Sequence, residues 1–220
     1  HFSRTNNTVA VAPLEVIRPE GSAQGQFTID FDTRTVRYRG QSGMDPIALA
    51  RMIDVFPERF LALFTFPGST IIRSEGMANF RDIHATDVTA TVVSRNMTVD
   101  FFDGRDVAFD VHMQGPTATI TRVEGSLCGG SFAGNGQVVI PTAAQTYLSY
   151  TMQMDFKDWD LTQVASLVRT NLSHDYRGLF SGRLEMAGLF GKGNGRTAVG
   201  KGHLVIRDGH VFTLPIFGGL

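Results

Sequence analysis

The sequence predicts a mainly β protein with two short amphipathic helices. Apolar and polar residues alternate with a period of two over most of the chain, as they do in strands that bury one face. Turn dipeptides such as Asp208-Gly209, which are typical of hairpins, separate some of the alternating segments. Two other segments place apolar residues at helical spacing. Strands of a parallel sheet would give continuous apolar runs, so an antiparallel sheet is expected.

The alternating segments are expected to form hairpins. A turn is predicted at Asp103-Gly104, and the turn at Asp208-Gly209 is expected to bring Leu204 and Ile206 opposite Val211. In chain order, the predicted strands cover residues 27–31, 36–38, 97–101, 107–113, 148–156 and 204–206.

Both predicted helices have recognisable N-termini. Asp45 is the expected N-cap of the first helix, and Pro46 occupies its first position. Apolar residues at helical spacing continue to Phe64, and Pro57 is expected to kink or split this helix. The second helix begins with the capping box at residues 160–163. Its apolar side consists of Leu161, Val164, Leu167, Val168 and Leu172.

The order of strands, helix and strands occurs twice, at an offset of roughly 110 residues. Glycine-rich residues 21–27 precede the first hairpin and helix, and residues 130–138 precede the second. We therefore predict two modules, residues 1–120 and 121–220, that share one continuous sheet. Because the chain begins at His1 and ends in an apolar stretch, we interpret it as a piece of a longer protein.

The composition excludes several classes of function. Twenty basic and 21 acidic residues leave a net charge of -1. This balance argues against nucleic acid as a partner, because phosphate binding requires concentrated positive charge. The single cysteine, Cys128, excludes an intramolecular disulfide and a multi-cysteine zinc site. We interpret Cys128 as a small buried residue rather than a nucleophile.

The sequence carries no motif of catalysis or cofactor binding. Its six histidines form no HExxH pattern, and no GxSxG motif occurs. The glycine-rich residues 191–197 continue into a predicted strand, whereas a phosphate-binding loop opens a helix. The longest apolar run, residues 60–64, is far shorter than the roughly 20 residues of a membrane-spanning helix. We therefore expect a protein that is not an enzyme and that uses no cofactor or metal.

Phenylalanine and methionine are concentrated on the face of the strands that is expected to point inward. Methionine adapts to variable apolar partners. This face is either an ordinary core between a curved sheet and its helices, or a groove for acyl chains, which requires only an unbroken apolar path. The candidate groove residues are Phe27, Phe31, Met97, Phe101, Phe109, Met113, Met152, Met154, Phe156, Met186 and Phe212.

The chain from about Ile120 to Leu220 resembles a known family. Trp159-Asp160-Leu161-Thr162 opens a helix that is followed by the glycine-containing residues 178–188. A second glycine-rich segment, residues 200–209, precedes the ending Val211-Phe212-Thr213-Leu214-Pro215-Ile216-Phe217-Gly218. This pattern of glycines and apolar positions is similar to the C-terminal region of AsmA-like proteins of Gram-negative envelopes.

The resemblance implies a curved antiparallel β-sheet that forms an open hydrophobic groove, the β-taco or repeating β-groove shared with TamB-like proteins. It also implies a periplasmic location, with the parent protein anchored in the inner membrane. The implied function is non-enzymatic: acyl chains of phospholipid are held or conducted for lipid transport between the inner and outer membranes, or for outer-membrane biogenesis. The implied partners are a phospholipid or other lipid and envelope proteins.

A second hypothesis treats the chain as a structural or assembly module. The edges of a sheet with glycine-rich strands can bind strands of partner proteins by β-augmentation. The apolar face distinguishes a groove from a packed core, because it stays partly accessible in a groove.

Overall fold

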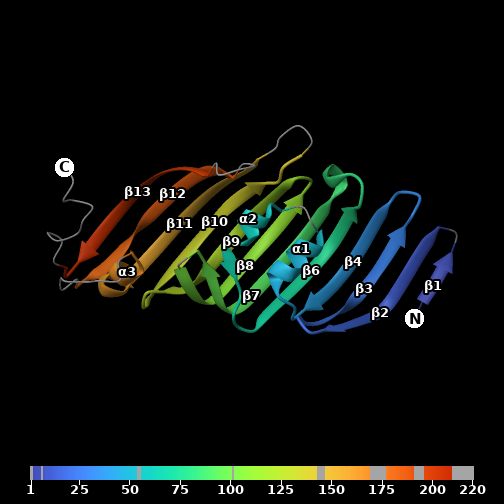
Figure 1. Cartoon of the computed structure of the whole chain (residues 1–220), viewed down its shortest axis with the longest axis horizontal. Helices are drawn as coiled ribbons and strands as arrows, with labels where there is room; N and C mark the ends of the chain where they lie inside the picture. Colours follow the sequence, from blue (N-terminus) through green and yellow to red (C-terminus); the bar gives the residue numbers. More distant parts are fainter. Residues whose placement is uncertain are drawn as a thin grey trace.

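The fold is a single twisted antiparallel sheet that curves around three short helices (Figure 1). It is seen in a computed structural model that describes residues 2–5, 7–53, 56–100, 102–142, 147–168, 177–190 and 196–209.

Thirteen strands are present in the described residues, and each pairs with antiparallel neighbours. Twelve of them lie in the sheet in chain order, and the short β5 pairs with the end of β7. The strands are β1 (Phe2–Thr5), β2 (Thr8–Arg18), β3 (Gly21–Asp30), β4 (Thr35–Ser42), β5 (Phe64–Thr65), β6 (Thr70–Asn79), β7 (Asp87–Val99), β8 (Phe102–Gln114), β9 (Thr117–Leu127), β10 (Gly130–Val139), β11 (Leu148–Asp160), β12 (Leu179–Phe190) and β13 (Arg196–Arg207). The prediction of a mainly β, antiparallel protein is confirmed.

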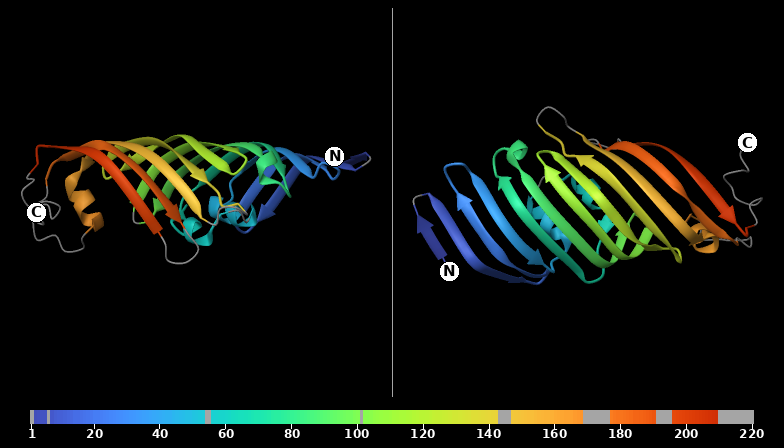
Figure 2. Two further views of the ribbon diagram at one scale, coloured as in Figure 1. Left: turned by 90° about the horizontal axis from the view of Figure 1, so that it is seen from above. Right: turned by 180° about the vertical axis from the view of Figure 1, so that it is seen from behind.

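The helices lie on one side of the sheet. Figure 2 shows the sheet as an arch with the helices on its inner side. Helices α1 (Pro46–Ile53) and α2 (Glu58–Leu61) stand between β4 and β6, and α3 (Leu161–Val168) follows β11 directly. A 3-10 turn, η1 (Ile83–Ala85), connects β6 to β7. In the described residues no helix is both long enough and apolar enough to cross a membrane.

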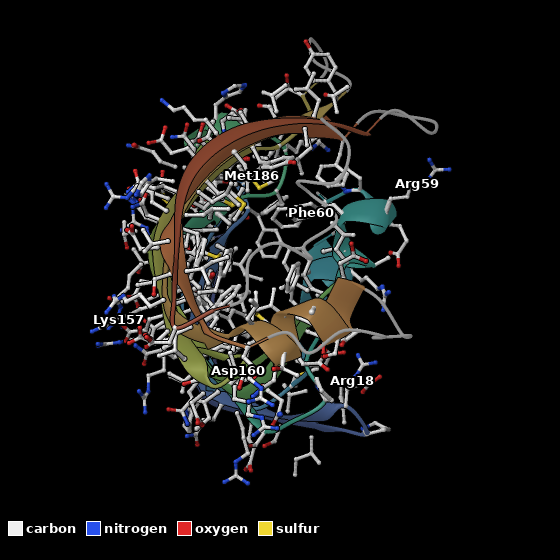
Figure 3. The ribbon with its side chains drawn as sticks, turned by 90° about the vertical axis from the view of Figure 1, so that its left-hand side faces the viewer. Arg18, Arg59, Phe60, Lys157, Asp160 and Met186 are labelled. Atoms are coloured by element: carbon white, nitrogen blue, oxygen red, sulfur yellow. The ribbon has the colours of Figure 1, made fainter. Side chains whose placement is uncertain are left out.

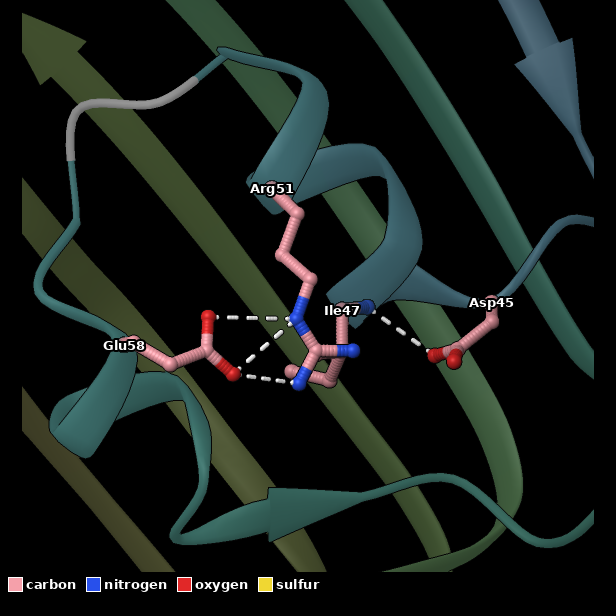
Figure 4. A network of polar contacts seen from close by, with 4 residues as sticks. All are labelled: Asp45, Ile47, Arg51 and Glu58. Carbon is pink, nitrogen blue, oxygen red and sulfur yellow. Dashed lines mark hydrogen bonds and ion pairs between the residues drawn. The ribbon is translucent and has the colours of Figure 1, made fainter.

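The first helical segment begins and divides where the sequence predicts. The Ile47 amide donates a hydrogen bond to Asp45 Oδ1 at 2.9 Å, so Asp45 is the N-cap of α1 (Figure 4). Pro57 directly precedes α2 and separates it from α1. Arg51 of α1 then reaches Glu58 of α2, and its Nη2 lies 2.6 Å from Glu58 Oε1.

Asp160 caps α3. Its Oδ1 accepts hydrogen bonds from the amides of Thr162 at 2.8 Å and Gln163 at 3.2 Å. The reciprocal half of the predicted capping box is not formed, because the Asp160 amide donates to the Cys128 carbonyl at 2.7 Å. The helix is thereby tied to the turn between β9 and β10.

The cross-strand register decides which residues share a face, because directly opposed residues point to the same side. Gly136 lies opposite Met152, Met152 opposite Met186, and Met186 opposite Gly200. In Figure 3 Met186 lies inside the arch, whereas Lys157 points away from it. We call the face that carries Met186 the concave face, and the opposite face the outer face.

One predicted turn is wrong. Asp103 and Gly104 lie inside β8, and the turn comes between Val99 and Phe102, which face each other across β7 and β8. Asp100 has a φ of 58° there, a left-handed conformation that aspartate tolerates better than most residues. The predicted partner of Leu204 and Ile206, Val211, lies outside the described residues.

The two helical insertions occupy similar places in the chain. Both α1–α2 and α3 are inserted between strands that remain hydrogen-bonded neighbours, β4 with β6 and β11 with β12. The predicted module boundary at residue 120 falls inside β9, so the sheet is continuous across it. The division into two modules stays a prediction.

Candidate functional site

The concave face carries no charged side chain over most of its length. The residues of this face can be traced from strand to strand through directly opposed pairs. They extend from Val9–Val16 on β2, through β3, β4 and β6–β11, to Phe180–Phe190 on β12. They contain no Asp, Glu, Lys, Arg or His. Apolar side chains and glycines occupy most of these positions, so this face offers little to bind a charged ligand.

Four hydroxyl groups of the concave face are paired with one another. Thr70 Oγ1 and Ser94 Oγ lie 2.8 Å apart, and both residues are buried. Tyr38 Oη lies 3.0 Å from Ser74 Oγ, which donates to the Thr89 carbonyl at 2.9 Å. Hydroxyls satisfied in this way do not demand a polar partner from a ligand.

The outer face, by contrast, is strongly polar. Opposite charges meet across neighbouring strands and, for Arg122 and Glu124, within β9. Hydrogen bonds from Arg183 lower the pKa of Asp155. The ion pairs are Arg39–Glu75, His112–Asp87, Arg122–Asp110, Arg122–Glu124, Arg183–Asp155 and Lys201–Glu185. These contacts are exposed, so each contributes little to stability, but together they show which side of the sheet faces water.

Eight of the eleven candidate groove residues lie on the concave face. They occupy strands β3, β7, β8, β11 and β12, and their opposed partners are apolar residues, glycine or Tyr38. These eight are Phe27, Met97, Phe109, Met113, Met152, Met154, Phe156 and Met186.

The other three candidates do not join this group. Phe31 lies in the turn after β3 and is 54% exposed, because β3 ends at Asp30 and no strand neighbour positions its ring. Phe101 and Phe212 lie outside the described residues.

Two buried clusters cover part of the concave face. In the first, which we call the α3 cluster, Val164 and Leu167 of α3 pack over buried residues of the sheet. The buried members of the α3 cluster are Val107, Cys128, Phe132, Phe156 and Trp159. Burial raises the pKa of the Cys128 thiol, and the Asp160 carboxylate raises it further. Cys128 is therefore a packed residue held as the neutral thiol.

In the second cluster, which we call the α2 cluster, Phe56 and Phe60 pack over Ala118, Val138 and Leu148. Phe190 and Tyr150 complete it, with ring centroids 5.5 Å apart. Between the two clusters lies the row Gly136, Met152, Met186 and Gly200. Met152 and Met186 are only half-buried and belong to neither cluster.

The N-terminal part of the concave face has no buried residue on β2, β3 or β4. Its apolar side chains are all half-buried, although they form opposed pairs such as Val11 with Phe27 and Ile29 with Val36. The inward side chains here are Val9, Val11, Leu14, Val16, Phe27, Ile29, Val36 and Tyr38. Of these residues only Phe27 was a groove candidate, although the predicted strands 27–31 and 36–38 include Ile29, Val36 and Tyr38. The β2 positions were not predicted, and the alternation of Leu14, Glu15 and Val16 could have revealed them.

Two shallow hollows lie along the sheet. One of about 730 Å³ crosses β9–β13 and is lined by polar residues such as Asn135 and Gln153 together with Met152 and Met186. A second, of about 380 Å³, crosses β4, β6 and β7 beside Arg39 and Glu75. In the described part of the chain, no group of three or more His, Cys, Asp or Glu residues is placed to hold a metal ion.

Comparisons of the chain with protein-family models, with curated protein sequences and with solved structures found no match.

Proposed function

We propose that this chain is a non-enzymatic, AsmA-like segment that holds or conducts acyl chains of phospholipid in an open hydrophobic β-groove, the concave face of the sheet. In this proposal the chain lies in the periplasm and belongs to a parent protein anchored in the inner membrane. It serves lipid transport between the two membranes or outer-membrane biogenesis.

A single observation carries the proposal: the concave face is uncharged over most of its length, while the outer face of the same strands is lined with ion pairs. An ordinary core would close over this face. Here, β2, β3 and β4 contribute apolar side chains that stay half-accessible.

The energetics favour a ligand without specific polar contacts. Each methylene group removed from water contributes about 0.8 kcal/mol, so a long acyl chain binds through area alone. Adaptable methionines such as Met152 and Met186 suit chains that differ in length and unsaturation. The phospholipid headgroup would remain on the open side of the arch, in water.

The first test is purification of the chain from an envelope-containing bacterial host without detergent, followed by native mass spectrometry and lipid extraction. Phospholipid at about one molecule per chain supports the proposal. A folded wild-type chain that carries no lipid would contradict it.

A matched pair of variants tests whether the lipid binds on the concave face. Met152→Asp puts a charge on the concave face between the two clusters, and Thr151→Asp puts the same charge on the outer face one residue away. We expect Met152→Asp to lose the lipid and Thr151→Asp to keep it, with both variants folded by circular dichroism. Equal lipid content in the two folded variants would refute binding on the concave face.

One observation favours the second candidate function, an assembly module that binds partners through its sheet edges. Among the described strands β13 pairs with β12 alone, over twelve residues and without a bulge. Its exposed Val199 and Val205 make it a template for strand pairing. If this edge assembles, Val199→Lys together with Val205→Lys will abolish concentration-dependent association in sedimentation velocity. Association that persists in the double variant would exclude the β13 edge.

A further inference from the structure

Phe60 lies inside the arch and connects α2 to the far side of the sheet. Its ring centroid is 5.6 Å from that of Phe190 on β12, 5.2 Å from that of Phe64 and 6.0 Å from that of Phe56. Figure 3, viewed along the long axis of the sheet, shows Phe60 within the curve of the strands, on the inner side with Met186. The ring therefore stands in the path that runs across the strands.

The surroundings of Phe60 make it a fixed obstacle. Leu61, the next residue, is buried at 5% exposure. The bidentate contact of Arg51 with Glu58 joins α1 to the first residue of α2, with Nε–Oε2 and Nη2–Oε1 distances of 3.2 and 2.6 Å (Figure 4). Two independent contacts thus hold the short helix that carries Phe60.

The concave face differs on the two sides of the α2 cluster. Toward the N-terminus, the strands β2–β4 carry no buried residue. Toward the α3 cluster, on the same strands β11 and β12 that carry Tyr150 and Phe190, the half-buried Met152 and Met186 lie between the two clusters. An alkyl chain that extends along the inside of the arch from β2–β4 to β12 comes to the α2 cluster, where the ring of Phe60 contacts that of Phe190.

We propose that Phe60 is a partition that divides the concave face into two acyl-binding regions and limits the length of alkyl chain that each can hold. This inference rests on the proposed function and adds a length-determining residue to it. The physical basis is exclusion: an alkyl chain gains affinity with each added methylene only until its end meets the ring, and further methylenes stay in water.

The test is a series of saturated fatty acids from about 10 to about 20 carbons, measured by displacement of a fluorescent fatty acid. While the chain fits, each methylene tightens binding about fourfold. For the wild-type chain we expect this gain to stop at a definite length. In Phe60→Ala the gain should continue for at least two further carbons, which makes the longest acid bind roughly 15-fold more tightly than it binds the wild type.

Two further variants keep the test decisive. Phe60→Leu retains an apolar contact in case the alanine variant does not fold, and it should lengthen the limit by a smaller amount. Phe80→Ala removes a ring that is 56% exposed just after β6, and it should leave the limit unchanged. A limit that is the same in wild type and in folded Phe60 variants would overturn the partition while leaving the lipid function intact. If no fatty acid binds to wild type, both proposals fail.

Discussion

Arg51 of α1 and Glu58 of α2 form an ion pair across the break at Pro57, with Arg51 Nη2 2.6 Å from Glu58 Oε1. The pair is exposed, but it joins two short helices that are separate elements of the chain. The hydrogen bond from Arg51 is the main cause that lowers the pKa of Glu58.

The first prediction concerns pH. A carboxylate with a lowered pKa in the folded state stabilises the fold above its unfolded pKa, about 4.3 for glutamate, and this contribution disappears as pH falls through the lower folded value. Glu58→Gln should therefore lower the urea midpoint at pH 7 and change it less at pH 3. Glu15→Gln, at an exposed position on β2, is the control. A midpoint difference for Glu58→Gln that is independent of pH would contradict the assignment.

The second prediction concerns the glycines of the concave face. A Cβ at Gly136 would lie 2.7 Å from the Thr151 carbonyl oxygen of the next strand, whereas one at Gly43 would meet nothing closer than 3.8 Å. We expect Gly136→Ala to destabilise the fold by about 1–3 kcal/mol and Gly43→Ala to be tolerated. Urea denaturation followed by circular dichroism measures both. Equal stability of the two variants would show that β10 and β11 can move apart far enough to accommodate a Cβ at residue 136.

The third prediction concerns Trp159, the single tryptophan of the chain. Its Nε1 donates a hydrogen bond to the Ser131 carbonyl at 3.0 Å, and the residue is 7% exposed. Trp159→Phe leaves this carbonyl without its donor and should cost about 1–3 kcal/mol. Ser131→Ala keeps the backbone acceptor, so it should cost much less. A penalty of the same size in Ser131→Ala would mean that packing at the start of β10, rather than the hydrogen bond, is responsible.

The fourth prediction concerns the Cys128 thiol. Burial and the Asp160 carboxylate both raise its pKa, so the nucleophilic thiolate is scarce in the folded state. At pH 8 we expect alkylation roughly 100-fold slower than in urea. Asp160→Asn keeps an N-cap residue on α3 and removes the charge, so alkylation should become faster while the fold persists. An unchanged rate in this variant would leave burial as the only cause.

Local patterns predicted the antiparallel class, the helix starts and six strand segments, which lie in or overlap β3, β4, β7, β8, β11 and β13. Strand alternation reports which residues share a face, and the caps at Asp45 and Asp160 are single-residue features with local hydrogen bonds. The turn predicted at Asp103-Gly104 is wrong because Asp100 and Asp103 are both suitable turn residues. The pairing of β8 with β7 places the turn at Asp100.

The candidate site was harder to predict, because it depends on contacts between distant parts of the chain. Phe60 meets Phe190 only because the sheet curves, and no local pattern reports curvature. The same curvature requires the inward glycines at Gly25, Gly136 and Gly202, which the sequence shows only as a glycine-rich composition.

The helical insertions have a consequence for how such a protein can vary. Each leaves one strand and returns to the strand beside it, β4 to β6 and β11 to β12, so the ladder is continuous beneath it. The helices can therefore change without a change in the strand pairing of the sheet beneath them. Under the proposed function, redesign of α1 and α2 would alter the lipid that is bound, and added strands would lengthen the groove, each without rebuilding the other.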